Sequence, residues 1–164
     1  MNIFILDENP EKAARDHCDK HVIKMILESG QMLCSAHEQG KAPWKRSHYN
    51  HPCTIWARTT KENYRWLATL GLELCAEYTR RYNKHHKSEN VLIWCAENIP
   101  TTIPDGPLTQ FAIAIKNSAY HRPTAVESYR AYYIGDKVRF ARWKYCEPPQ
   151  WWISVFGEQQ KDCP

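Results

Sequence analysis

The chain opens with a short apolar run and then repeats apolar positions at the period of an α-helix. Residues 3–6 (IFIL) predict a strand or a buried extended arm. Asn9-Pro10 then predicts a helix start, because Asn caps free N–H groups and proline's missing N–H costs nothing at the first position. We expect one continuous helix over 10–38, stopping at Gly40 and weakened in its middle by Gly30. Its apolar face comprises Ala14, Cys18, Val22, Met25, Met32, Leu33 and Ala36.

The second third of the chain contains a polar loop and a second long helix. Residues 39–52 lose the helical period and predict a loop. Pro52 can open a short helix that carries Ile55 and Trp56. Thr59-x-x-Glu62 matches a capping box. The long helix expected after it, over about 60–83, should bury Leu67, Leu70, Leu74 and Tyr78.

The last third contains shorter elements separated by turn-forming residues. Ser88 predicts the cap of a helix that runs through Trp94 and Cys95, and residues 99–107 (IPTTIPDGP) predict a loop. Residues 111–115 (FAIAI) fit a strand or a helix. Thr124 with Glu127 predicts a capping box and a helix through Tyr133, and a basic, aromatic tail follows from Gly135 to Trp152. The expected class is mostly α: a compact single-domain helical fold over 1–164, with a short N-terminal extended arm and long loops.

Composition fits a globular protein with room for an anionic partner. The 164 residues are 43% hydrophobic and 24% charged, which suits one domain and argues against disorder. No apolar run has the length of a membrane span, and the start of the chain lacks a secretory pattern, so we expect a soluble, cytoplasmic protein without a membrane partner. A net charge of +4 and an aromatic content of 12% permit phosphate contacts and stacking on bases.

The cysteines point away from zinc ribbons and disulfide frameworks. There are seven, at positions 18, 34, 53, 75, 95, 146 and 163. The number is odd, the spacings are wide and no CxxC occurs. We expect most of them to be reduced, buried thiols that pack as small apolar residues.

The strongest candidate chemistry lies on the first predicted helix. His17, His21, Lys24 and Glu28 follow one another at steps of four, three and four, which places them on one stripe beside the apolar face. Asp19 lies about 200° around the helix from His17. The favoured interpretation is an acid–base or nucleophilic site, in which Lys24 attacks and Glu28 or Asp19 moves protons.

Two other interpretations of this stripe stay open. The groups could make only hydrogen bonds and ion pairs at the edge of the core. Alternatively, His-x-x-x-His could grip zinc, with His48, His51 and Cys53 as outside ligands. The zinc interpretation lacks the Glu of HExxH, and Lys24 would repel the ion. We expect neither a metal nor another cofactor.

Two basic and aromatic clusters are candidates for contacts to phosphates and bases, although a solvated loop or a packed core explains single members equally well. The first cluster is Trp44, Arg46, His48, Asn50, His51 and Arg58, and the second is Arg122, Arg130, Lys137, Arg139 and Arg142. Phosphate binding by a glycine loop is unsupported, because neither a Walker A motif nor GxGxxG occurs. GxSxG and the zinc-deaminase motif are missing too.

The order of these segments resembles the bacteriophage pyrimidine-dimer DNA glycosylase family. The similar segments are 50–82, 103–115 (IPDGPLTQFAIAI) and 121–133 (HRPTAVESYRAYY). The strings HCDKHVIKM and YYIGDKVRFARW also resemble small tailed-phage proteins, which implies the cytoplasm of an infected bacterium. The resemblance implies a helical protein that kinks duplex DNA. It also implies attack of an amine on C1′ of a damaged nucleotide, a Schiff base and then strand cleavage, assisted by a glutamate on the first long helix.

The chain departs from that family at both catalytic positions. The family uses the amine of an N-terminal threonine, whereas Asn2 follows Met1 here, and removal of Met1 is not expected. Lys24 stands near the position where simple alignment needs the glutamate. Lys24 or Lys20 is therefore expected to supply the amine. Two alternatives remain: a transferase or hydrolase that modifies a nucleotide or base on the same scaffold, and a module that only binds nucleotides or nucleic acid.

Overall fold

The structure is a computed structural model that describes residues 1–157 and contains no strand within them. This confirms the mostly α class. The connections are a 3₁₀ turn η1 (Ser118–Tyr120), a π-helical turn η2 (Tyr133–Lys137) and long loops. The α-helices are α1 (Pro10–Asp16), α2 (Asp19–Ser35), α3 (Pro52–Ala57), α4 (Lys61–Tyr82), α5 (Glu89–Glu97), α6 (Ala125–Tyr132) and α7 (Gln150–Phe156).

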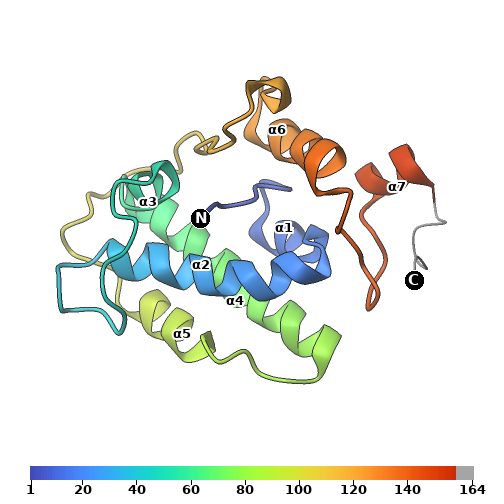
Figure 1. Cartoon of the computed structure of the whole chain (residues 1–164). Coiled ribbons are helices and arrows are strands. Elements are labelled where there is room, and N and C mark those ends of the chain that lie inside the picture. The colour runs from blue at the N-terminus through green and yellow to red at the C-terminus, as the bar shows by residue number, and fades with distance from the viewer. Residues whose placement is uncertain (158–164) are drawn as a thin grey trace.

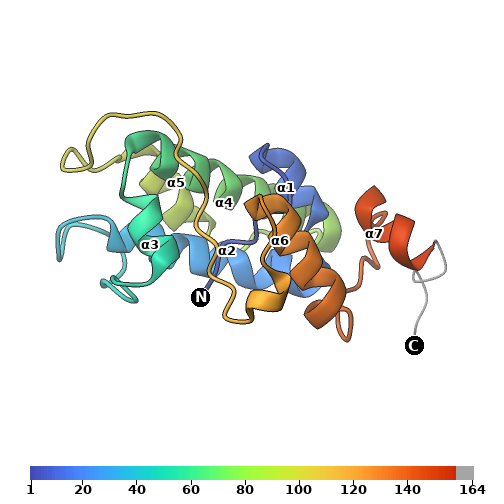
Figure 2. The ribbon, with the colours of Figure 1, turned by 90° about the horizontal axis from the view of Figure 1, so that it is seen from above.

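Helix α4 is the centre of the packing. Helices α1, α2, α3 and α5 all contact α4, and α2 also contacts α5 (Figures 1 and 2). Residues 3–6 are the predicted arm: they are buried and unpaired with any strand, and the chain bends at Leu6, whose N–H donates to the Phe4 carbonyl at 3.0 Å. Helix α6 lies on the other side of this arm, where Tyr129 hydrogen-bonds to Asn2 and Arg130 to the Leu6 carbonyl. The arm is therefore enclosed between the α2–α4 layer and the C-terminal third of the chain.

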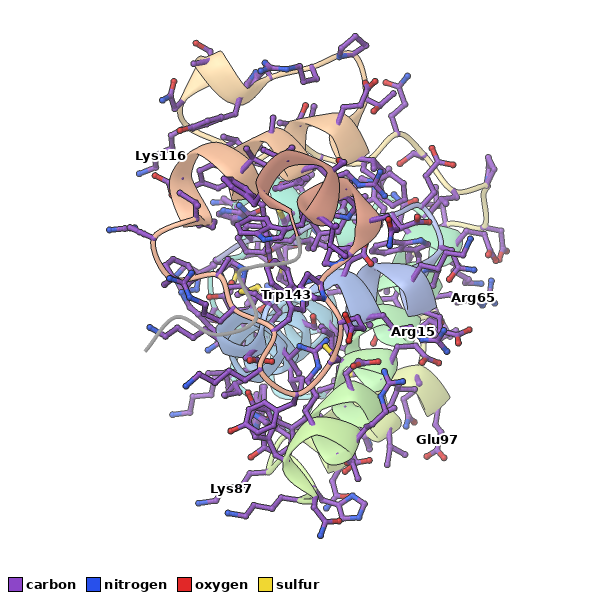
Figure 3. The ribbon with its side chains drawn as sticks, turned by 90° about the vertical axis from the view of Figure 1, so that its right-hand side faces the viewer. Arg15, Arg65, Lys87, Glu97, Lys116 and Trp143 are labelled. Atoms are coloured by element: carbon purple, nitrogen blue, oxygen red, sulfur yellow. The ribbon has the colours of Figure 1, made fainter. Side chains whose placement is uncertain are left out.

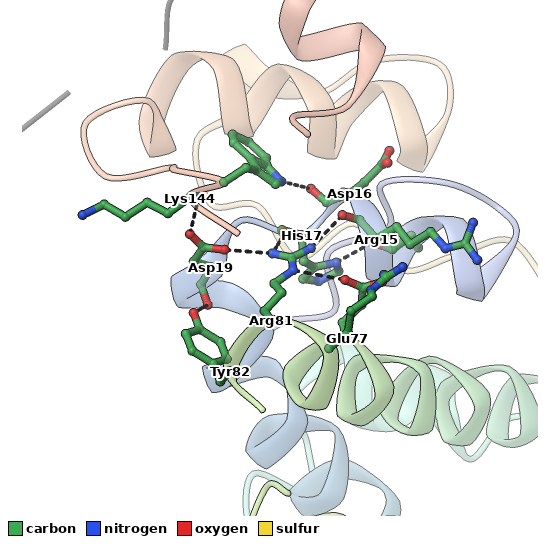
Figure 4. A network of polar contacts seen from close by, with 11 residues as sticks. Arg15, Asp16, His17, Asp19, Glu77, Arg81, Tyr82 and Lys144 are labelled. Carbon is green, nitrogen blue, oxygen red and sulfur yellow. Dashed lines mark hydrogen bonds and ion pairs between the residues drawn. The ribbon is translucent and has the colours of Figure 1, made fainter. Parts of the chain in front are cut away.

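The predicted helix over 10–38 is wrong in its continuity, because His17 and Cys18 are extended and separate α1 from α2. The cause is Arg81 on α4, whose side chain is completely buried. Its guanidinium donates to the carbonyls of Arg15 and His17, which would otherwise continue the helical hydrogen bonds, and it pairs with Asp19 at 3.1 Å (Figure 4). Helix α2 also ends at Ser35, well before Gly40.

The predicted helix starts lie close to the observed ones, but the residue that caps α4 is one position later than predicted. The capping box of Thr124 and Glu127 is present at the start of α6. The predicted box at Thr59 is wrong: Thr60 caps α4 by accepting from the Asn63 N–H, and the Thr59 hydroxyl donates to Ile55. Ser88 precedes α5 without a side-chain capping bond. Residues 111–115 form neither a strand nor a helix, and the chain there runs extended past Tyr129.

Small residues and thiols fill the tight places of the core. A Cβ at Gly30 would lie 2.6 Å from Cζ3 of Trp44, so the glycine that weakens α2 is needed for Trp44 to pack. Of the six cysteines within residues 1–157 all are free thiols, and Cys146 alone among them is not fully buried. This confirms the expected packing role, while Cys163 lies outside the described residues.

The aromatic tail belongs largely to the core. Trp143 is 4% exposed and Trp152 is fully buried, with their rings 4.9 Å apart. Figure 3 views the molecule from the right-hand side of Figure 1. Trp143 lies near the middle of this view, whereas the charged side chains of Lys87, Glu97 and Arg65 project at its edge. Within residues 1–157, no helix combines the length and the apolar character that crossing a bilayer requires.

Candidate active site

A cavity of about 490 Å³ opens where the N-terminal arm, α2 and the segment after α6 meet. This volume lies in the usual range for sites that bind small ligands. Its wall carries four cationic side chains, and Glu28 is the one carboxylate among its lining residues. The lining residues are Met1, Asn2, Phe4, Lys20, His21, Lys24, Met25, Glu28, Tyr132, Lys137, Arg139 and Phe140.

Glu28 is the carboxylate around which the cavity is organised. The residue is 7% exposed and accepts the backbone N–H of Asn2 at 2.9 Å. Its carboxylate also lies 3.9 Å from the α-amino nitrogen of Met1 and 3.4 Å from Nζ of Lys24. A buried carboxylate beside amines can accept and return their protons. The spacing of Lys24 and Glu28 predicted their contact, whereas the approach of the arm has no local signal in the sequence.

Asn2 fixes the arm against Glu28, and sequence reasoning missed this role. Its side-chain oxygen accepts from the Tyr129 hydroxyl at 2.7 Å and from the Ile3 N–H at 2.9 Å. Its side-chain nitrogen donates to the Ala114 carbonyl at 3.3 Å. A polar residue directly before the buried run 3–6 is the one signal that could have indicated an anchored arm.

His21 lines the cavity as a neutral imidazole. Its Nδ1 lies 2.5 Å from the hydroxyl of Tyr133, and its ring stacks on Phe4 with centroids 4.3 Å apart. Burial, followed by electrostatic interactions with His17, Lys137 and Lys24, lowers the pKa of His21 to about 2. The group therefore stays uncharged throughout the physiological range.

His17 and Asp19 lie outside the cavity. His17 is fully buried at the break between α1 and α2, and its Nδ1 is 2.6 Å from the Ala13 carbonyl. Burial lowers the pKa of His17 to about 4. Asp19 accepts from Arg81 and from the Lys144 N–H at 2.8 Å (Figure 4). His21, Lys24 and Glu28 therefore line the cavity. Asp19 instead links the start of α2 to α4, through Arg81, and to the segment before α7, through the Lys144 N–H.

No group of three or more His, Cys, Asp or Glu side chains within residues 1–157 is placed to hold a metal ion. His51 instead caps α3, where its Nδ1 accepts the Cys53 N–H at 3.2 Å. The pKa of His51 is lowered by burial and then by the positive charge of the N-terminus.

Of the predicted nucleic-acid contacts in the tail, Lys137 and Arg139 reach the cavity wall. Lys137 is held by Asp136 at 2.8 Å and by the Tyr132 hydroxyl at 3.0 Å. Arg130 and Arg142 donate to backbone carbonyls, and Arg130 also pairs with Asp7 at 3.5 Å. Arg122 is exposed and donates to carbonyls of its own turn.

The predicted contacts of the loop over 39–52 form a separate surface beside α3. The guanidiniums of Arg46 and Arg58 lie 4.2 and 3.7 Å from the ring centroid of Tyr49. His48, with φ 47°, and Asn50 are exposed on the same loop. Trp44 is half-buried against Gly30, so packing accounts for part of its ring.

Comparison with protein-family models gives a match to part of the chain. The family model described as pyrimidine dimer DNA glycosylase matches residues 1–90. That range holds the arm, α1 to α4, and the cavity residues His21, Lys24 and Glu28. No curated protein and no solved structure matches the chain.

Proposed function

Because this chain belongs to the pyrimidine dimer DNA glycosylase family, we propose that it breaks the glycosidic bond of a damaged pyrimidine in duplex DNA through an amine held against Glu28. The observation that carries the proposal is the contact of one buried carboxylate with two amines, Lys24 and the α-amino group of Met1. Lys20 also lines the cavity, but its Nζ lies over the Phe140 ring at 5.4 Å.

The chemistry follows from this arrangement. An amine attacks C1′ of the deoxyribose after it gives a proton to Glu28, and the new C–N bond forms as the glycosidic bond breaks. The electron pair of the broken bond leaves with the base. The sugar ring then opens to a Schiff base as O4′ takes the proton held by Glu28, and transfer of a C2′ proton to the Glu28 carboxylate expels the 3′ phosphate and cleaves the strand.

The cationic wall suits the same substrate. Lys137 and Arg139 stand at the cavity beside Lys20 and Lys24. Cations in these positions would hold the phosphates that flank a damaged nucleotide, and they would position the sugar without reading sequence. For a phage-encoded protein, the site of action would be the cytoplasm of the host bacterium.

Borohydride trapping on a duplex that contains a cyclobutane pyrimidine dimer tests the proposal. Borohydride reduces the Schiff base and leaves the protein covalently joined to DNA, and peptide mapping of the adduct identifies the attacking amine. We expect an adduct on Lys24 or on the α-amino group of Met1. The matched control is Lys87→Ala, an exposed lysine that does not line the cavity and whose loss should not change the yield.

The same trapping assay can contradict the proposal. If wild-type protein gives no adduct under conditions that trap a known enzyme of this chemistry, the amine mechanism is wrong. Binding of the same duplex without any adduct would instead favour a module that only binds nucleic acid. An adduct on a residue outside the cavity would contradict the role of Glu28.

A further inference from the structure

His21 is tethered by one ring nitrogen to a tyrosine 112 residues further along the chain. Tyr133 is fully buried in η2, and its ring meets the imidazole at 73°. Phe4 stacks on the imidazole with 23° between the ring planes, and its ring also meets that of Tyr133, with centroids 5.4 Å apart. These contacts hold the ring in one place at the cavity wall. Because Nδ1 is engaged by Tyr133, Nε2 is the nitrogen left for a ligand.

The contact with Tyr133 also decides where the ring carries its proton. A tyrosine hydroxyl has one hydrogen to donate. Its neighbours are Nδ1 of His21, at 2.5 Å, and the thiol and backbone N–H of Cys18. Neutral imidazole nitrogen accepts more strongly than a thiol sulfur, and the backbone N–H is itself a donor. The hydroxyl therefore donates to Nδ1, and the proton of the neutral ring sits on Nε2.

An uncharged ring with a proton on Nε2 has a restricted chemistry. Burial and the surrounding positive charges keep it neutral, as described above. Nε2 cannot act as a general base, because it already carries a hydrogen. It can donate a hydrogen bond to an oxygen that gains negative charge, and it needs no change in its own protonation to do so.

We infer that the Nε2–H of His21 donates a hydrogen bond to the carbonyl oxygen of the departing pyrimidine, and that Tyr133 is the positioning residue that sets the donor. When the C1′–N1 bond breaks, its electron pair passes to N1 and is shared with the adjacent carbonyl oxygen O2. A fixed donor at O2 stabilises that charge as it develops. The inference rests on the proposed function and extends it to the leaving group.

Two duplexes separate this role from a structural one. One carries a pyrimidine dimer, and the other carries an abasic site, which has no base to release but still forms a Schiff base. With His21→Leu, we expect borohydride trapping on the dimer duplex to slow about 100-fold, while trapping on the abasic duplex keeps the wild-type rate. Tyr133→Phe should show the same split with a smaller factor. His21→Gln, which can place an amide N–H near the position of Nε2, should recover part of the rate.

The outcomes are distinct. If His21→Leu slows both duplexes equally, or slows neither, the inference is overturned while the proposed function stands. If wild-type protein traps on neither duplex, the proposed function fails and the inference fails with it. ¹⁵N NMR of the imidazole ring gives a readout that is independent of activity. It should place the ring proton on Nε2 in the wild type, and a proton on Nδ1 would overturn the inference.

Discussion

At the scale of single residues, the site depends on a few polar groups whose positions are fixed by packing and hydrogen bonds within the core. The helical spacing of His21, Lys24 and Glu28 predicted that they share one stripe, and the cavity contains all three. The sequence could not place Asn2 beside them. Its partners Ala114 and Tyr129 lie 112 and 127 residues away, and no local pattern reports a contact of that range. His17 belongs to that stripe only in a continuous helix, and the break at His17 and Cys18 removes it.

Because His17 is buried, a low pH should reduce the stability of the fold. In the unfolded chain a histidine binds a proton near pH 6.5, whereas folded His17 stays neutral down to a pKa of about 4. Between these values the unfolded state binds more protons, so the free energy of unfolding falls as the pH falls. For His17 alone the loss from pH 7 to pH 4 is about 3 kcal/mol.

Urea unfolding at a series of pH values measures this loss, and buried His21 should add to it with the same sign. His17→Gln should flatten the curve in this window. His85→Gln is the control, because the His85 side chain is 79% exposed and should leave the curve as it is. A wild-type stability that does not change between pH 7 and pH 4 would contradict the buried, neutral state of His17.

At the scale of elements, helix starts were predictable and the helix break was not. The Asn9 cap of α1 and the Thr124 box of α6 are decided by side chains within four residues of the helix start. The break between α1 and α2 is decided by Arg81, which is 64 residues from His17 and takes its carbonyl. Periodicity alone continues the helix through this point, because Cys18 and Val22 fall on the buried face in either case.

Arg81 should therefore be among the most sensitive positions of the fold. Arg81→Met removes the donor to two carbonyls and leaves Asp19 and Glu77 without their buried partner. We expect a loss of about 3–5 kcal/mol in the free energy of unfolding. Arg65→Met on the same helix is the control. Its ion pair with Glu62 is about half exposed, so its cost should stay below about 1 kcal/mol. Equal losses at the two positions would show that Arg81 does not hold the break.

At the scale of the whole molecule, the cavity is assembled from three distant parts of the chain. The arm and α2 supply Met1, Lys24 and Glu28, whereas Lys137 and Arg139 come from the segment after α6. The family match ends at residue 90, so two of the four cationic side chains of the wall, Lys137 and Arg139, lie beyond it. Composition indicated an anionic partner. It could not tell Lys137, at the cavity, from Arg130, whose guanidinium binds the Leu6 carbonyl and Asp7.

Salt dependence of DNA binding separates these two cations. Lys137→Ala should reduce the slope of log affinity against log salt by about 1, because a phosphate contact releases a counterion. Arg130→Ala should leave the slope unchanged and lower the free energy of unfolding, by about 1–3 kcal/mol, because it removes contacts within the fold. A reduced slope for Arg130→Ala with an unchanged slope for Lys137→Ala would contradict phosphate binding at the cationic wall of this cavity.

Glu28 is the group on which the proposed chemistry depends most, because it moves protons beside the amine. The direct test compares Glu28→Gln with wild type, in strand cleavage and in binding of the same dimer-containing duplex. Glutamine can still accept the Asn2 N–H, so the arm should keep its place, but it cannot take a proton from the amine. We predict that cleavage falls by about 10²–10⁴-fold while affinity for the duplex is retained. Cleavage at the wild-type rate by Glu28→Gln would contradict proton transfer by Glu28.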